Sequence, residues 1–275
     1  MKNFKIFVFI FIFLVACTEI HDKKSDAERT TALKNITLIS LDQNYFIETE
    51  KDLSITSTIK KIRQNYFITS KILQNGTVYE CASIDRNSPE IKYYVKCHYL
   101  GKWNNRYVIF RYYETGGTGR FTDIILCSIN KDILRFDKVL LLGDRALDGI
   151  IDSPVLKNDK IYFKSHLSLT SFASLSEINE DYILYGLSQA SQDYWNISDC
   201  MYDLKNSKLH LRSISINPKG EHTSNINKIL KILIPKAETQ IVHINQSNIL
   251  NFLKKFKSAY LSIYQDNNSP KICQY

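Results

Sequence analysis

Residues 91–129 read IKYYVKCHYLGKWNNRYVIFRYYETGGTGRFTDIILCSI, and this stretch decides the fold class. It holds three runs rich in tyrosine, phenylalanine, isoleucine and valine, the residue types that favour strands. Residues typical of turns separate the runs, GKWNN at 101–105 and ETGGTG at 114–119. We therefore expect consecutive antiparallel strands at 91–99, 106–113 and 121–129.

The same pattern continues on both sides of this stretch. Further strands are predicted at 36–41, 64–73, 77–84, 133–142, 160–164, 197–204 and 208–216. Many short strands joined by turns, without alternating helices, indicate an antiparallel sandwich, barrel or propeller-like sheet. The expected class is mainly β, with an α+β arrangement left open, and residues 35–275 are expected to form a single β-rich globular domain.

Helical patterns are confined to the second half of the chain. Residues 167–192 are expected to be partly helical. The clearest helix lies near the end, where Ser247 can cap it and an apolar stripe runs from Ile249 to Tyr264. Three lysines at 254–257 lie off this stripe, so the helix could rest on a membrane. Such a stripe more often packs on a sheet, and that is the prediction.

The first sixteen residues have the three zones of a secretory signal. Lys2 and Lys5 precede the apolar run IFVFIFIFLVA at 6–16, and a polar stretch follows. As a helix, this run would span only ~16 Å. The hydrocarbon core of a bilayer is about 30 Å thick, so a membrane-spanning helix is the weaker interpretation.

The residues Leu14-Val15-Ala16-Cys17 resemble the lipobox of bacterial lipoproteins. The resemblance implies that a diacylglyceryl group is added to the Cys17 thiol, that residues 1–16 are removed as a signal peptide, and that the new amino group is often acylated, typically with palmitate. Residues 17–34 would then be a lipidated cysteine and a polar tether reaching roughly 20–25 Å. An Asp directly after the cysteine would resemble an inner-membrane retention signal. Thr18 stands there instead, which implies the outer membrane, facing the periplasm. An ordinary signal peptide with a chance cysteine is the alternative.

The remaining cysteines would lie in an oxidising compartment, where an odd number leaves one thiol free. Cys81 and Cys97 flank a predicted hairpin, and a turn centred near Pro89 would place them opposite each other for a disulfide. Another register would place them out of reach. The next most plausible disulfide joins Cys200 and Cys273. Cys127 lies in an apolar strand and is the expected free thiol.

The sequence carries no recognisable catalytic or metal motif. Gly116-Gly117-Thr118-Gly119 leads into a strand and favours a hairpin turn over a phosphate loop. Glycines around Asp144, Asp148 and Asp152 favour structural turn acids over a calcium site. The six histidines have no metal spacing, so no metal or cofactor is expected. The net charge of +8 is scattered, which together with secretion argues against a nucleic-acid partner.

Four short segments, GGTG-RF, GDR, DGII and IYFK between residues 116 and 164, are weakly similar to uncharacterised Gram-negative envelope proteins. This similarity implies a related fold at most. We expect a membrane-anchored envelope lipoprotein that binds a protein, a glycan or another surface ligand without catalysis, an immunity protein being one form. The alternative is a periplasmic hydrolase whose site is assembled from scattered residues, with His98, His166 or His210 beside a carboxylate.

Overall fold

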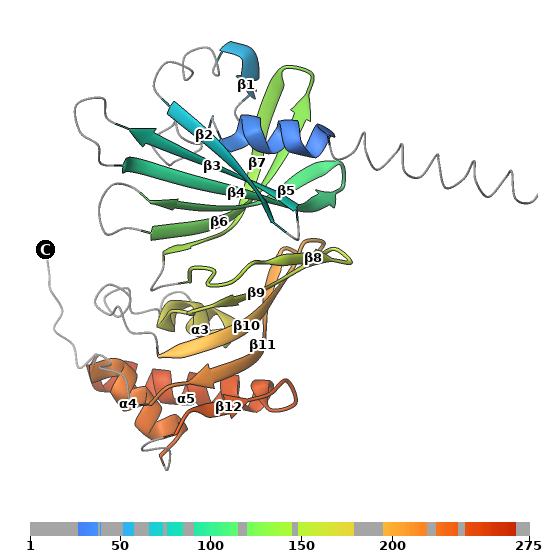
Figure 1. The fold of residues 1–275 in the computed structure, drawn as a ribbon. Helices are drawn as coiled ribbons and strands as arrows, with labels where there is room; N and C mark the ends of the chain where they lie inside the picture. Colours follow the sequence, from blue (N-terminus) through green and yellow to red (C-terminus); the bar gives the residue numbers. More distant parts are fainter. Residues whose placement is uncertain are drawn as a thin grey trace, which may run out of the picture. The chain divides into compact units, whose positions relative to one another are not determined.

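The computed structural model is mainly β, with two antiparallel sheets and a C-terminal helix, which confirms the predicted fold class (Figure 1). It describes residues 27–37, 39, 52–57, 66–73, 76–84, 91–114, 120–144, 148–178, 195–218, 224–235 and 240–267. Cys17, the signal segment and the glycine turn at 116–119 lie outside these ranges.

The first sheet has seven strands in the order β1-β7-β6-β5-β4-β3-β2. From β2 to β7 each strand pairs with the next along the chain, as expected for strands joined by short turns. The bounds are β1 Asp52–Ser54, β2 Tyr66–Leu73, β3 Gly76–Ile84, β4 Ile91–Trp103, β5 Arg106–Glu114, β6 Arg120–Asn130 and β7 Ile133–Asp144. The three strands of the opening stretch are therefore β4, β5 and β6.

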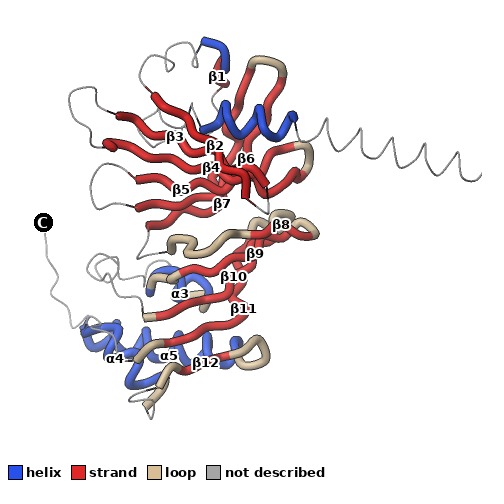
Figure 2. Tube along the Cα trace, in the orientation of Figure 1, coloured by secondary structure: helices blue, strands red, loops and turns tan. Residues whose placement is uncertain are grey.

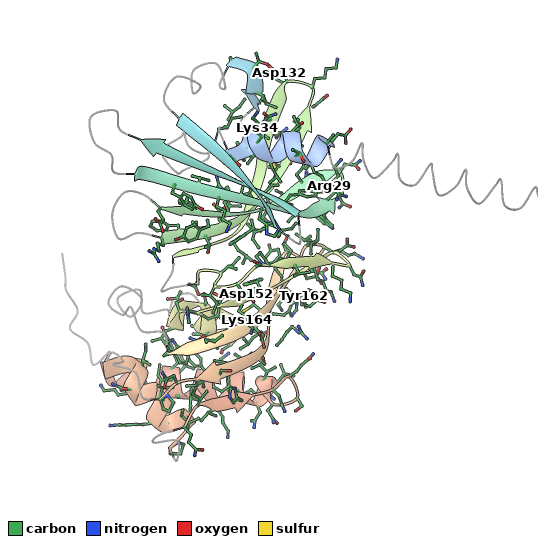
Figure 3. The ribbon with its side chains drawn as sticks, in the orientation of Figure 1. Arg29, Lys34, Asp132, Asp152, Tyr162 and Lys164 are labelled. Atoms are coloured by element: carbon green, nitrogen blue, oxygen red, sulfur yellow. The ribbon has the colours of Figure 1, made fainter. Side chains whose placement is uncertain are left out.

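The carboxylate of Asp132, between β6 and β7, fixes the short edge strand β1 (Figure 3). The Ser54 hydroxyl donates to Asp132 Oδ2 at 2.7 Å. The backbone N–H and the hydroxyl of Thr56 donate to Asp132 Oδ1 at 2.8 and 2.5 Å. The bonds from Thr56 and Ser54 lower the pKa of Asp132 below its ordinary value.

A helix over residues 27–37 belongs to the same unit as this sheet. Ala32, Leu33 and Ile36 are buried, and Glu28 forms an ion pair with Lys102 of β4 at 3.7 Å. The prediction of a strand at 36–41 is therefore wrong for Ile36, and a flexible tether is wrong for residues 27–34. Residues 18–26 lie outside the described ranges. Packing of an apolar stripe outweighs the weak strand preference of threonine and isoleucine here.

The second sheet has five strands in the order β12-β11-β10-β9-β8. Its edge strands, β8 and β12, are three residues long. The bounds are β8 Val155–Lys157, β9 Lys160–Ser165, β10 Asn196–Asp203, β11 Lys208–Ile216 and β12 Val242–Ile244. The inner three strands are those predicted at 160–164, 197–204 and 208–216, with bounds shifted by at most one residue.

Three helices accompany the second sheet: α3 Leu169–Leu175, α4 Ser224–Leu233 and α5 Ile249–Asn267 (Figure 2). Both α3 and α5 contact β11, and α4 packs on α5. The ring of Phe172 on α3 lies 5.0 Å from that of Trp195 and 5.4 Å from that of Phe256 on α5, measured between centroids. The apolar stripe of α5 is therefore buried, as predicted for a helix that packs on a sheet.

Two compact units can be distinguished by their internal contacts. The first comprises Met1–Gly116 and Leu126–Lys138, and the second comprises Gly117–Ile125 and Val139–Tyr275. Strands β6 and β7 contribute residues to both units, so the single domain expected over residues 35–275 stays a prediction.

Candidate functional site

The candidate site is one face of the five-stranded sheet. Side chains alternate across a strand, and in β9 Ile161 and Phe163 are buried whereas Lys164 is exposed. In β10 Cys200 and Tyr202 are buried in the same alternation. We call the opposite side the outer face, defined by Asp152, Tyr162, Lys164, Asp199 and Arg212. Figure 3 labels three of these, on β9 and beside it.

A β-bulge places Arg212 on the outer face. Asp199 pairs with Ser213, but the next residue, Cys200, pairs with Leu211, so Arg212 has no residue opposite it. A bulge of this kind redirects a side chain. The Arg212 guanidinium carbon lies 5.2 Å from the ring centroid of Tyr162, which belongs to β9, two strands away. This cation–π contact stabilises the pair by about 0.5–1 kcal/mol at an exposed site.

Two carboxylates lie beside these cations. Asp199 pairs in register with Lys164, and its Oδ2 accepts a hydrogen bond from the Ser213 hydroxyl. Asp152 Oδ1 accepts from the backbone N–H of Lys164 at 2.8 Å. Partial burial raises the pKa of Asp152, and the charge of Asp199 adds to this rise, whereas Lys164 opposes it. Among the five residues that define the outer face, two acids and two bases balance in formal charge.

A second polar cluster, on the loop before α3, is structural. Asp148 has a φ of 59°, in the left-handed region that Asp tolerates better than most residues. Its Oδ1 accepts from the Ser168 N–H at 2.9 Å, and its Oδ2 accepts from the Ser168 hydroxyl at 2.8 Å. Ser168 Oγ in turn caps α3 by accepting from the Ser171 N–H at 3.1 Å. A Cβ at Gly143 would lie 2.2 Å from the carbonyl carbon of Asp148, so this path of the chain requires glycine at 143.

The aspartates expected to be turn acids therefore have separate partners. Asp148 holds Ser168, Asp152 holds Lys164, and the side chain of Asp144 lies outside the described atoms. Within the ranges that the structure describes, no group of three His, Cys, Asp or Glu residues is arranged to hold a metal ion.

The hydrolase alternative requires a histidine beside a carboxylate, and the partners of His166 and His243 bear on it. His166 Nδ1 lies 2.6 Å from the backbone oxygen of Asn196, and because a carbonyl can only accept, Nδ1 carries the proton. Burial lowers the pKa of His166, and the bond to Asn196 opposes this shift. His243 Nδ1 lies 2.8 Å from the exposed Ser215 hydroxyl. Among the described residues no carboxylate is hydrogen-bonded to His243, so this Ser–His contact lacks the third member of a triad.

The predicted disulfide between Cys81 and Cys97 is wrong. Cys81 pairs with Val95, and Cys97 pairs with Tyr79 and is a buried thiol that forms no disulfide. The two cysteines are thus two positions out of register, which places their Cα atoms about 7–8 Å apart. Disulfides require Cα atoms about 4.4–6.8 Å apart.

The other described cysteines, Cys127 and Cys200, form no disulfide either. Cys200 is a free, buried thiol, so its predicted disulfide is absent, and Cys273 lies outside the described ranges. Cys127 is buried and free, the state predicted for it. Burial raises the pKa of both Cys127 and Cys200, which keeps these thiols protonated and unreactive.

The sequence contained one signal for the outer face that the strand prediction did not use. In β11 the buried apolar residues fall at Leu211, Ile214 and Ile216, so one interval is three residues and the next is two. A three-residue interval in a strand indicates a bulge. The partner of Arg212 could not be predicted, because it depends on the register of three strands.

No protein family, curated protein or solved structure matches the chain. Within the part of the chain that the structure describes, no helix is both long enough and apolar enough to cross a membrane.

Proposed function

We propose that this protein is a lipid-anchored lipoprotein of the bacterial cell envelope that binds a protein partner through its outer face. The anchor rests on Leu14-Val15-Ala16-Cys17 after an apolar run and two lysines. Two or more acyl chains on one cysteine hold a protein stably at a bilayer, because each buried CH₂ contributes about 0.8 kcal/mol. With Thr18 after the cysteine, we place the protein at the outer membrane, facing the periplasm.

The contact between Arg212 and Tyr162 carries the binding proposal. Arginine and tyrosine are enriched among the residues that dominate protein–protein binding energies. Here a bulge takes Arg212 out of the strand register and the ring of Tyr162 lies under its guanidinium group. Balanced acids and bases beside the pair favour a partner with complementary charges of both signs. A periplasmic toxin, as for an immunity protein, is one such partner.

Metabolic labelling tests the anchor. Cells expressing the full chain are fed radiolabelled palmitate, and the protein is immunoprecipitated. The wild type should be labelled, and Cys17→Ser should lose the label and keep the uncut N-terminus. Labelling that persists in Cys17→Ser would overturn the anchor.

Recovery of a partner from detergent-solubilised envelopes tests the binding face. The wild type should recover a stoichiometric protein, and Arg212→Ala or Tyr162→Ala should weaken that binding about 10- to 30-fold, the range for truncation of a central interface residue. Lys205→Ala, at an exposed position in the turn between β10 and β11, is the matched control and should bind as the wild type does. Failure to recover any partner, or equal loss in the control, would refute the proposed face.

A further inference from the structure

The helices α4 and α5 carry mostly positive charge. Together they contain five lysines and one acid, Asp266, in the last turn of α5. The outer face of the sheet, in contrast, pairs its lysine and arginine with two aspartates. A helical surface with excess positive charge attracts an anionic partner.

Two of the three lysines of α5 are exposed, away from its buried stripe, whereas Lys257 is half-buried and donates to the backbone oxygen of Glu177 at 2.8 Å. Phe252, Phe256 and Tyr260 are buried at intervals of four residues. Lys254 and Lys255 are exposed, and Leu250, one turn before Lys254, is 72% exposed. Because residues four apart share a helix face, Leu250 and Lys254 lie side by side on the outward side.

Helix α4 has the same outward chemistry. Ile226, Ile229 and Leu230 are buried, whereas Lys228, Lys231 and Ile232 are exposed. Ile232 is 52% exposed. Since α4 packs on α5, both helices contribute to one end of the second unit, where Figure 1 draws them beside each other. We call the exposed side chains Lys228, Lys231, Ile232, Leu250, Lys254 and Lys255 the basic helical surface.

We propose that the basic helical surface binds the anionic headgroups of a lipid bilayer. Its lysines match the negative surface potential of such a bilayer. Exposed Leu250 and Ile232 beside the lysines favour a membrane over an acidic protein, because apolar side chains can enter the headgroup region while lysines snorkel toward the phosphates. The inference rests on the proposed function for its setting, since the acyl chains on Cys17 would hold the protein at a bilayer. The binding itself belongs to the helices and needs no acyl chain.

Vesicle sedimentation tests this surface. The full chain carrying Cys17→Ser, so that no acyl chain contributes, is mixed with vesicles of pure phosphatidylcholine or of phosphatidylcholine with ~30% phosphatidylglycerol. The apolar run at 6–16 is present in every variant and cancels in the comparison. We expect stronger binding to the anionic vesicles, and a loss of this excess at high salt because added ions screen the charges.

Paired variants identify the residues responsible. Lys254→Gln with Lys255→Gln should weaken binding to anionic vesicles about 30-fold, since each lysine near such a surface contributes ~1 kcal/mol. The same double change at the exposed residues Lys157 and Lys208 is the matched control and should weaken it little. Leu250→Gln should weaken binding about tenfold through lost apolar contact.

Each outcome decides between explanations. Equal weakening by the control pair, or no preference of the parent protein for anionic vesicles, overturns the proposal. Soluble polyglutamate provides the other arm: capture of polyglutamate without binding to anionic vesicles would assign the surface to an acidic protein. Palmitate labelling of the wild type is independent of these lysines, so failure of the anchor and failure of the basic helical surface are distinguishable.

Discussion

Asp148 offers a quantitative test of how the second unit is held together. Asp148→Ala removes both hydrogen bonds to Ser168, one of which leaves a buried backbone N–H without its partner. A hydrogen bond to a charged group contributes about 1.5–3 kcal/mol net, and because both bonds share one carboxylate we take ~3 kcal/mol for the pair. Alanine also fits the left-handed backbone at this position less well, which adds about 1 kcal/mol. The expected loss is ~4 kcal/mol.

Two matched variants separate these contributions. Asp148→Asn keeps one acceptor for the Ser168 N–H and tolerates the positive φ of 59°, so it should lose less than about 1.5 kcal/mol. Asp148→Gly accepts the backbone angle but loses both bonds, so it should lose ~3 kcal/mol. Urea unfolding followed by circular dichroism measures all three. Thermal midpoints should fall by roughly 8–16 °C for alanine.

The order of the three losses is the critical result. If asparagine destabilises the protein as much as alanine does, the acceptor role of the carboxylate is not what stabilises this loop. If glycine matches the wild type, the hydrogen bonds contribute nothing measurable and the left-handed backbone explains the whole effect.

Asp132, the buried cysteines and Phe256 provide the other tests. Hydrogen bonds lower the pKa of Asp132 below its ordinary value, so its stabilising contribution is full above that value and is lost as pH falls through the folded pKa. The protection of the β1 amides against hydrogen exchange, corrected for the intrinsic pH dependence of exchange, should therefore fall in acid, and Asp132→Asn should show no such acid step. A charged thiol reagent should leave Cys127 and Cys200 unmodified until the protein is unfolded, and modification of the native protein would contradict their burial. Phe256→Ala should lose about 3–5 kcal/mol in urea unfolding, whereas Leu250→Ala should stay within ~0.5 kcal/mol because its side chain is exposed.

Strands were predictable where apolar side chains alternate or turns are marked by glycine and asparagine. In β5 the burial alternates from Ile109 through Arg111 to Tyr113, after a fully buried start at Tyr107 and Val108. The charged Arg111 among them shows that position in the register, rather than residue type, decides burial. Helix α5 was equally predictable from the sequence, because its stripe of aromatic residues is long enough to distinguish a helical from a strand period.

Helix α4 was missed for a physical reason. Its apolar residues Ile226, Ile229 and Leu230 have helical spacing, but the segment has only ten residues and its isoleucines favour strands. Contact with α5 then decides the conformation, and a pairwise contact of this kind cannot be read from either segment alone. The predicted cap of α5 at Ser247 is also wrong. The Ser247 hydroxyl donates to Asn245 Oδ1 at 2.7 Å, and α5 begins two residues later, at Ile249.

The candidate site was less predictable than the fold. Tyr162, Asp199 and Arg212 come from three strands, and their meeting depends on the bulge between Asp199 and Cys200. The disulfide prediction for Cys81 and Cys97 failed for the same reason, because a register shifted by two positions separates the two residues. Chemistry that depends on register is specified by the whole sheet, whereas alternation is specified by each strand.

The three-residue edge strands β8 and β12 affect how readily the second sheet can aggregate at high protein concentration. A sheet edge exposes unpaired backbone groups on which another chain can add a strand, and short edges limit this. The second sheet ends on both sides in such strands, Val155–Lys157 and Val242–Ile244, while its long strands β9, β10 and β11 lie inside. When these molecules are crowded together, the second sheet therefore presents little template for edge-to-edge fibril growth.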